Sequence, residues 1–381
     1  MPSQQTTIFS PTELAYLHIS LSLQPPIRPD ARSPTTFRPL IGEIDLLPST
    51  NGSARLCFAD GTEGIVGVKA EVGRTGHGPT DEASGPEEAS RSGDETRNRG
   101  DVETKDHPIE KDGESSWVEV TIDLPGQRED DFMVTSITQM IHEGLVTDGT
   151  LPRKLYINSN WHWKLYIDVM TFPHISTPPL LTVLQILLLS PLSSYPLPLL
   201  SLSTHLALFS TRLPALISQG EEDPLFNDDW EAALPLYQKP NTKAPAHTMQ
   251  NAPKPPVSIM AISVGPNLFF DPSREELAVA DAVVVVTVTS HFSPNDDGDG
   301  EGNNGVKILA IRTLDPPSAL TTSSSAALGG EPGFDQMEDG EGDWKPKRGG
   351  MKREVLSKLV DLCCKKGGMG EEILEALKAF V

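Results

Sequence analysis

The stretch NGSARLCFADGTEGIVGVKAE, residues 51–71, decides how the first part of this chain folds. Its Asn-Gly pair at 51–52 and its Asp-Gly pair at 60–61 are dipeptides that favour tight turns between antiparallel strands. Residues 53–58 and 64–71 have the composition of short strands, and residues 43–47 form another strand candidate before the first turn. The sequence therefore predicts an antiparallel meander.

A helix is predicted before this meander. Ser10, Pro11 and Glu13 have the pattern of a helix start, with a capping serine, a proline in the first turn and a glutamate three residues after the cap. Leucines then recur at helical spacing, and the prolines at 25 and 26 end the helix. The segment 28–32, RPDAR, cannot extend the helix and is predicted to be a turn.

Strand and helix patterns follow the meander. Residues 117–124, WVEVTIDL, alternate apolar and polar side chains as a strand does. Without the polar segment between them, 64–72 and 117–124 are predicted to be neighbouring strands. A helix is predicted over 129–143, with Gly144 as its stop and one apolar side, namely Phe132, Met133, Ile137, Met140 and Ile141. Further strands are predicted at 154–157 and 164–168.

The second part of the chain mixes strands and helices in the same way. Apolar residues between 199 and 213 are spaced three and four apart, which predicts a buried helix face. Strands are predicted at 257–264, 282–289 and 306–313. The middle one is almost wholly apolar and is therefore expected to be buried on both faces. Two helices, at 354–363 and 371–380, end the pattern.

Two segments lack the apolar residues that a folded core needs. Residues 73–116 contain 12 Asp or Glu, 6 Lys or Arg and no aromatic residue, so we expect a disordered acidic insertion. This insertion is interpreted either as a loop that the fold tolerates or as an interaction tail. Residues 322–350 are of low complexity.

Composition excludes several classes of protein. The chain has 381 residues and a formal net charge of −22, which argues against a protein that binds nucleic acid on its own. Its 3 cysteines are too few for a disulfide scaffold and suit a reducing compartment. We expect no secretory signal, because the first residues are polar and uncharged. We expect no membrane span, because prolines interrupt the leucine-rich stretch 180–209.

Seven short motifs together resemble the RNase PH family, and in particular the RNase PH-like ring subunits of the eukaryotic RNA exosome. They are IRPDAR at 27–32, FR at 37–38, NGSAR at 51–55, GVKAE at 67–71, LYID at 165–168, ALFSTRLP at 207–214 and DPSREEL at 271–277. Each motif is weak alone, but their order makes the set specific. One departure is Ala31, since the family usually has glycine there.

The resemblance implies an α+β RNase PH-like fold, with two βαβ-type halves, mixed sheets and packed helices. On that basis we expect residues 1–26 to form the N-terminal helix. The first part would comprise 27–72 and 117–240, with 73–116 as an insertion. The second part would comprise 257–381.

The resemblance also implies a function. Family members assemble into rings with a central channel for RNA. A non-catalytic ring subunit would support 3′–5′ processing and degradation of rRNA, snRNA and mRNA in the nucleus, nucleolus and cytoplasm. Its partners would be other RNase PH-like ring subunits, RNA-binding cap subunits, associated hydrolytic 3′–5′ exonucleases, and RNA through a composite channel. The alternative is a phosphorolytic 3′–5′ exoribonuclease that is active in its own right.

The motifs that active family members use for catalysis are not found here. Phosphorolysis needs a fixed cation for phosphate and an acid for the leaving oxygen. Active members have a Gly-Thr-Arg turn after the central strand, whereas residues 190–198 read SPLSSYPLP. They also have an acidic residue at the position of Leu277, and their catalytic aspartate comes slightly later than Asp281. We therefore expect no catalytic residues, and Asp281 is predicted to position a local element.

No other chemistry is suggested by the sequence. Cys363 and Cys364 are adjacent rather than spaced as metal ligands, and the acidic loop at 297–308 has Ile308 where a calcium loop ends in glutamate. We expect no cofactor and no metal. The candidate RNA-binding residues are Arg55, Arg153 and Lys154, near loops that approach the channel in the family. The alternative is that they are ordinary solvated surface charges.

Residues 169–185 have no counterpart in the family pattern. Removing them joins LYID at 165–168 directly to ILLL at 186–189, which gives one uninterrupted apolar element. The segment begins with valine, whose codons start with GT, and ends with glutamine, which CAG can encode. It is interpreted either as a retained intron or as a genuine loop insertion.

Overall fold

A computed structural model of the chain describes residues 9–59, 61–75, 113–125, 127–172, 195–218, 220–237, 254–293, 303–314 and 350–380. Most of the predicted acidic insertion, most of the segment 169–185 and nearly all of the low-complexity segment therefore lie outside the described residues. Among the described residues, no helix is long and apolar enough to cross a membrane.

The described chain alternates strands and helices throughout. The elements are α1 (Pro11–Ser22), β1 (Leu40–Ile44), β2 (Gly52–Phe58), β3 (Glu63–Arg74), η1 (Ser115–Trp117), β4 (Val118–Asp123), α2 (Phe132–Val146), α3 (Thr150–Leu155), β5 (Trp161–Phe172), α5 (Leu197–Ser210), β6 (Arg212–Leu213), η2 (Trp230–Ala232), β7 (Leu234–Pro235), β8 (Val257–Val264), β9 (Asn267–Phe270), α7 (Arg274–Ala278), β10 (Ala282–Ser293), β11 (Asn303–Leu314), α8 (Arg353–Cys364), α9 (Met369–Ala376) and η4 (Leu377–Phe380).

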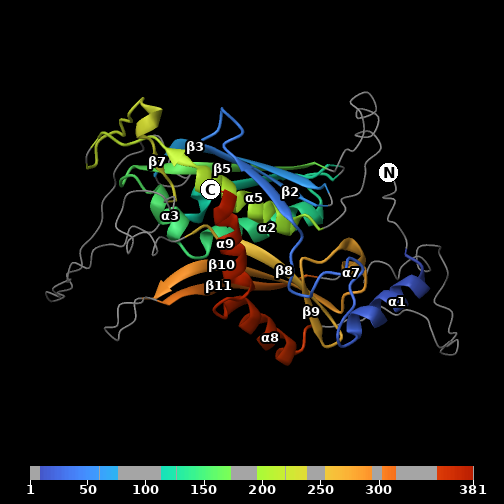
Figure 1. Ribbon diagram of the computed structural model, residues 1–381. Helices are drawn as coiled ribbons and strands as arrows, with labels where there is room; N and C mark the ends of the chain where they lie inside the picture. The colour runs from blue at the N-terminus through green and yellow to red at the C-terminus, as the bar shows by residue number, and fades with distance from the viewer. Residues whose placement is uncertain are drawn as a thin grey trace, which may run out of the picture.

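Two main sheets enclose a layer of helices (Figure 1). The first has the order β1-β2-β3-β5-β4, and the second has the order β11-β10-β8-β9. Helix α5 packs on strands of both sheets, and α2 contacts β4 and β8. Every residue of α5 is buried. The sequence predicted one buried face for this helix, but it lies between two sheets and is covered on all sides.

Helix α1 starts as the sequence predicted. Ser10 caps the helix and forms a reciprocal capping box with Glu13. Leu14 and Leu21 are buried in the core. The turn after the helix is also confirmed, and Ala31 adopts a positive φ of 59°, the left-handed conformation that glycine would take more easily.

The antiparallel meander β1-β2-β3 is confirmed, but its first strand lies earlier than predicted. Strand β1 ends at Ile44, because Asp45 turns into the left-handed region with φ 58°. Gly52 does not have a positive φ in the turn and instead opens β2. A Cβ atom on Gly52 would lie 2.5 Å from the Thr211 Cα atom, so the glycine permits a close approach of two backbones.

Strands β3 and β4 are not neighbours, contrary to the prediction. Strand β5 lies between them, antiparallel to β3 and parallel to β4. The connection from β4 to β5 runs through α2 and α3, and a helical crossover of this kind is what joins parallel strands. Strand β4 therefore forms an edge of the first sheet.

Helix α2 runs past the glycine that was predicted to stop it. Gly144 lies inside the helix, where a Cβ atom would come 3.2 Å from Cγ2 of Thr287. The glycine thus serves close packing of the helix on the second sheet. The helix ends at Val146, and Gly149, with φ 66°, follows as the left-handed residue. Phe132 was predicted to be buried but is 85% exposed at the start of the helix.

Residues 154–157 do not form the predicted strand. Lys154 belongs to the short helix α3, and Tyr156 makes only an isolated bridge to His162. Pro152 lies in the first turn of this helix. Proline is tolerated there because the N–H group that it lacks would have no partner within the helix. Beyond them, β5 extends through Phe172, so the first four residues of the segment 169–185 pair with β3.

The second sheet matches the predicted strands at 257–264, 282–289 and 306–313. Strand β8 is buried at every position, and β10 is buried at every position from Ala282 to Thr289, as its apolar sequence indicated. The sequence did not predict β9 or α7. The two C-terminal helices are confirmed as α8 and as α9 with η4, and they pack against β10 and β11 (Figure 1).

Candidate functional site

Arginines in the sequence motifs are candidates for an anion site. Arg28, however, is paired with a carboxylate inside the protein. Its guanidinium donates from Nε and Nη2 to the two carboxylate oxygens of Glu276, each at 2.7 Å, and both side chains are fully buried. The Nη2 group also donates to the carbonyl of Asp271 at 3.2 Å. Glu276 in turn closes the capping box of α7 with Ser273. This pair joins the turn after α1 to the second sheet.

Arg32 and Arg38 converge on Asp271. Arg32 donates from Nη1 to Oδ2 at 2.8 Å, and Arg38 donates from Nη2 to Oδ1 at 2.6 Å. Burial alone would raise the pKa of Asp271, but the hydrogen bond and charge of Arg38 and the charge of Arg32 hold that pKa below its ordinary value. Asp271 has φ 49°, so a strained backbone places its carboxylate between the two arginines.

Asp281 also has a positioning role, as the sequence predicted. Its Oδ2 atom accepts a hydrogen bond from the backbone N–H of Gly265 at 2.7 Å. Its Oδ1 atom lies 3.3 Å from Nε2 of His18 on α1. The carboxylate thereby fixes the turn between β8 and β9, where Gly265 has φ 58°, against the N-terminal helix.

The N-terminus of α5 overlaps residues 190–198, the stretch that the sequence resemblance compares with a phosphate-binding turn. Residues 190–194 lie outside the described part of the chain. The described residues at this end are Tyr195 and Pro196, which precede the helix, and Leu197, which begins it, and none of them carries a cation. Burial raises the pKa of Tyr195 to about 12.

The candidate RNA-binding residues lie on two different elements. Arg55 on β2 donates to both carboxylate oxygens of Glu63, at 3.1 and 2.7 Å, and its side chain is 40% exposed. Hydrogen bonding to Glu63 and the charge of Glu63 raise the pKa of Arg55. Arg153 and Lys154 lie in the last turn of α3. Arg55 is thus on a strand of the first sheet, whereas the other two residues are on a helix.

Arg153 and Lys154 differ in exposure. Arg153 is exposed, whereas the Lys154 ammonium donates to the carbonyl of Leu236 at 3.1 Å and lies 3.5 Å from the ring centroid of Tyr237. Burial lowers the pKa of Lys154 to about 8. The ammonium group therefore has internal partners, and the assignment of these three residues to RNA stays a prediction.

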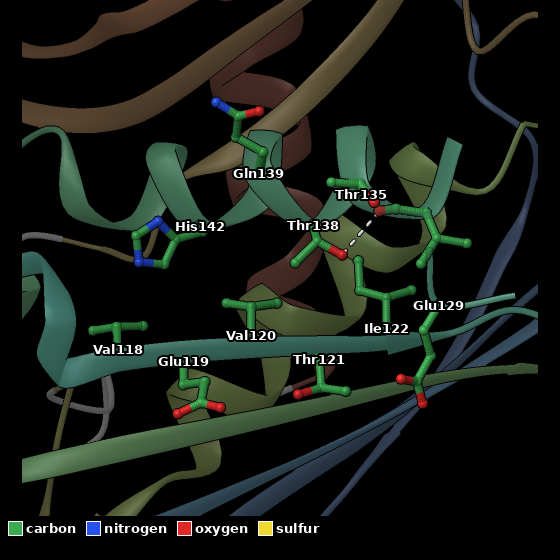
Figure 2. A pocket seen from close by; sticks show the side chains of 11 residues that line it. Val118, Glu119, Val120, Thr121, Ile122, Glu129, Thr135, Thr138, Gln139 and His142 are labelled. Carbon is green, nitrogen blue, oxygen red and sulfur yellow. Dashed lines mark hydrogen bonds between the residues drawn. The ribbon is translucent and has the colours of Figure 1, made fainter. Parts of the chain in front are cut away.

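A groove of about 620 Å³ lies between the edge strand β4 and helix α2 (Figure 2). In Figure 2, Val118, Val120 and Ile122 point from β4 towards the helix, and Glu119 and Thr121 point to the other side of the strand. The lining residues are Val118, Glu119, Val120, Thr121, Ile122, Glu129, Val134, Thr135, Thr138, Gln139 and His142. Lysine and arginine are absent from this set, so the groove is not suited to hold phosphate groups.

The sequence did not predict these arrangements. Nothing near Glu276 in the sequence points to Arg28 as its partner. The groove depends on β4 lying at the sheet edge beside β5, whereas the sequence predicted this strand to lie beside β3. Within the described residues, no cluster of histidine, cysteine and acidic side chains could hold a metal ion.

Comparisons with known proteins agree with the fold. The chain is 28% identical over 284 residues to the exosome complex component RRP42 of Saccharomyces cerevisiae, an alignment that covers 73% of this chain and 80% of the yeast protein. It is 27% identical over 337 residues to exosome complex component rrp42 of Schizosaccharomyces pombe, covering 83% of this chain and 92% of that protein. No family model matches the chain.

Solved structures agree at the level of the fold. An archaeal exosome core chain superposes with a TM-score of 0.50 at 16% identity, covering 97% of this chain and 96% of that one. The expected resemblance is therefore confirmed: this chain has the α+β fold of RNase PH-like exosome subunits and is similar over most of its length to the RRP42 components of yeast exosomes.

Proposed function

We propose that this chain is a non-catalytic ring subunit of an RNA exosome, which supports 3′–5′ processing and degradation of RNA by completing the ring. The observation that carries the proposal is the similarity to two yeast exosome components along most of both chains, together with the fold. The partners would be other RNase PH-like ring subunits, RNA-binding caps and associated exonucleases. RNA would pass through a channel to which several chains contribute.

The described side chains support a structural rather than a catalytic role. Arg28, Arg32 and Arg38 are engaged by Glu276 and Asp271, and Asp281 is engaged by the turn at Gly265. These groups stabilise the contact between the N-terminal segment and the second sheet. A phosphorolytic enzyme would instead need a cation and an acid that are free to reach phosphate and the leaving oxygen.

The test combines assembly with activity. The tagged full-length chain is expected to co-purify with several other RNase PH-like chains, as measured by native mass spectrometry of the intact complex. The purified chain alone, given RNA and inorganic phosphate, is expected to release no nucleoside diphosphates. Recovery of the chain without any RNase PH-like partner would contradict the ring assignment. Processive release of nucleoside diphosphates by the chain alone would instead favour an active phosphorolytic exoribonuclease.

Two finer points belong to the same proposal. We place the protein in the nucleus, nucleolus and cytoplasm, which fluorescence microscopy of the tagged chain tests. We also keep Arg55, Arg153 and Lys154 as RNA contacts in the ring. Phosphate contacts give affinity without sequence preference. Replacement of these three residues by alanine in the reconstituted ring should therefore weaken the binding of all RNA substrates to a similar extent.

A further inference from the structure

Five of the 16 large apolar side chains that are exposed among the described residues lie on one projecting segment of the first part of the chain. This segment, here called the arm, comprises residues 212–218 and 220–237 and includes β6, η2 and β7 (Figure 1). Its large apolar side chains that face solvent are Leu216, Ile217, Leu225, Trp230 and Leu234. Leu225 is 61% exposed and Trp230 is 48% exposed. Five exposed apolar side chains within one short segment make it a candidate interaction site.

The arm has a defined conformation of its own. Strands β6 and β7 pair antiparallel, and the N–H of Ile217 donates to the carbonyl of Leu225 at 2.8 Å. The ring of Phe226 packs against Trp163 of β5, with 4.9 Å between ring centroids. Phe226 thus anchors the arm to the first sheet, while its neighbour Leu225 remains in solvent.

Polar contacts also hold the arm against the loop that precedes β5. The Asn158 amide donates to the carbonyl of Glu222 at 2.9 Å, and the N–H of Ser159 donates to the Glu221 carboxylate at 2.8 Å. The indole of Trp161 donates to Asp223 at 3.2 Å. Because these contacts already order the arm, a partner would lose little free energy in fixing its shape.

The charge on the arm has one sign. Six exposed acidic residues accompany the apolar side chains, and they are Glu221, Glu222, Asp223, Asp228, Asp229 and Glu231. Arg212 is the one basic residue in the described part of the arm. Six carboxylates against one guanidinium give the described part of the arm a net negative charge. The negative potential disfavours RNA and anionic lipid, and it favours a partner that carries lysine or arginine.

From these observations we infer that the arm is a docking surface for a basic, amphipathic polypeptide segment, whose apolar side chains cover Leu225 and Trp230 and whose cations face the carboxylates around them. A second copy of this chain fits poorly, because it would bring another net charge of −22 to the surface. The inference goes beyond the proposed function and does not depend on it, since it rests on the exposure and charge of the arm alone.

The experiment uses the full-length chain and fluorescent synthetic peptides. The probe is a short helical peptide of leucine and lysine, and two reference peptides replace its leucines by serine or its lysines by glutamate. Fluorescence anisotropy is expected to detect binding of the probe and binding at least about tenfold weaker for both reference peptides. Hydrogen exchange of the complex is expected to protect amides within 212–237.

Variants locate the site on the chain. L225S/W230S and D228N/E231Q are each expected to weaken the probe about tenfold or more, because each pair removes one half of the recognition. The matched control I41S/Y16S replaces two exposed apolar residues away from the arm, which are 68% and 72% exposed, and should change binding less than about twofold. Circular dichroism of every variant checks that the fold is retained.

Three results would overturn the inference. The first is equal binding of the serine-containing peptide, which would reduce the effect to charge alone. The second is an unchanged affinity in the arm variants. The third is self-association of the chain that the L225S/W230S variant abolishes, since the arm would then bind another copy of this protein. Failure of the chain to enter an exosome ring would leave all three readouts intact.

Discussion

Arg28 and Glu276 are 248 residues apart in the sequence and form a bidentate ion pair with no solvent exposure of either side chain. The pair joins the turn that follows α1 to helix α7, which lies between β9 and β10 in the sequence. Burying two charges costs free energy, so such a pair stabilises a fold only when both partners are present. The first prediction follows from this dependence.

R28M is expected to lower the free energy of unfolding by about 3–5 kcal/mol, because it leaves the Glu276 carboxylate buried without a partner. Urea unfolding followed by circular dichroism measures the change. The control R128M removes a cation that is 84% exposed and paired with Asp130, and it should cost less than about 1 kcal/mol. Equal effects of the two variants would contradict a special role for the buried pair.

Stability is expected to fall as the pH drops below about 6.5, because of His205. This side chain is buried, its Nδ1 atom donates to the carbonyl of Pro255 at 2.7 Å, and burial lowers its pKa from 6.5 to about 3. Between these two values the unfolded chain binds a proton that the folded chain does not, so acid favours unfolding.

The size of this effect can be measured against a variant. Between pH 7 and pH 5 we expect His205 to account for a loss of about 2 kcal/mol. In H205N, whose amide can still donate to Pro255, the difference between urea unfolding free energies at the two pH values should shrink by about that amount. An unchanged pH dependence in this variant would show that other groups cause the loss.

Gly52 is expected to tolerate no side chain. In G52A the new Cβ atom would lie 2.4 Å from Oγ1 and 2.5 Å from Cα of Thr211, so backbone would have to move. We expect a loss of about 3 kcal/mol or more, measured by urea unfolding. G350A is the matched control, because nothing lies within 4 Å of the corresponding position and its backbone is unstrained. A mild effect of G52A would mean that β2 can shift away from α5.

Replacement of Thr171 and of Thr289 by valine is expected to change stability in opposite directions. Both are buried, but the Thr171 hydroxyl has no hydrogen-bond partner among the described residues, whereas the Thr289 hydroxyl donates to the carbonyl of Lys254 at 2.9 Å. T171V is therefore expected to raise the melting temperature, with a gain of about 1 kcal/mol. T289V should lower stability by a similar amount. Destabilisation by both variants would indicate a partner for Thr171 outside the described residues.

Deletion of residues 169–185 tests whether this segment is part of the fold. The deletion brings Ile186 to the position of Val169 in the sequence and Leu188 to that of Thr171, where a buried apolar residue is suitable. The shortened chain is therefore expected to unfold at an equal or higher temperature. A loss of more than about 2 kcal/mol would favour a genuine insertion over a retained intron. A transcript that reads from the Asp168 codon to the Ile186 codon would settle the question directly.

Sequence patterns predicted an element correctly where its formation depends on residues close together in the chain. The capping box at Ser10 and Glu13, the meander and the buried strand at 282–289 need only neighbouring residues or continuous apolar character, so they could be predicted. The prediction that Gly144 ends its helix was wrong, because the role of this glycine depends on a residue far away in the sequence. A glycine in a helix pattern usually marks an end, but here it permits contact with Thr287 on the second sheet, which no local pattern encodes.

The candidate site shows the same division. The motifs indicated an exosome ring subunit, and the acidic composition argued against a protein that binds nucleic acid on its own, because charge and motif identity are properties of the sequence. The sequence could not show which carboxylate each arginine contacts or that Lys154 lies against Tyr237. It also could not show which apolar residues of the arm face solvent. Those outcomes depend on contacts between residues far apart in the chain, and only the packing of the two sheets around α2 and α5 determines them.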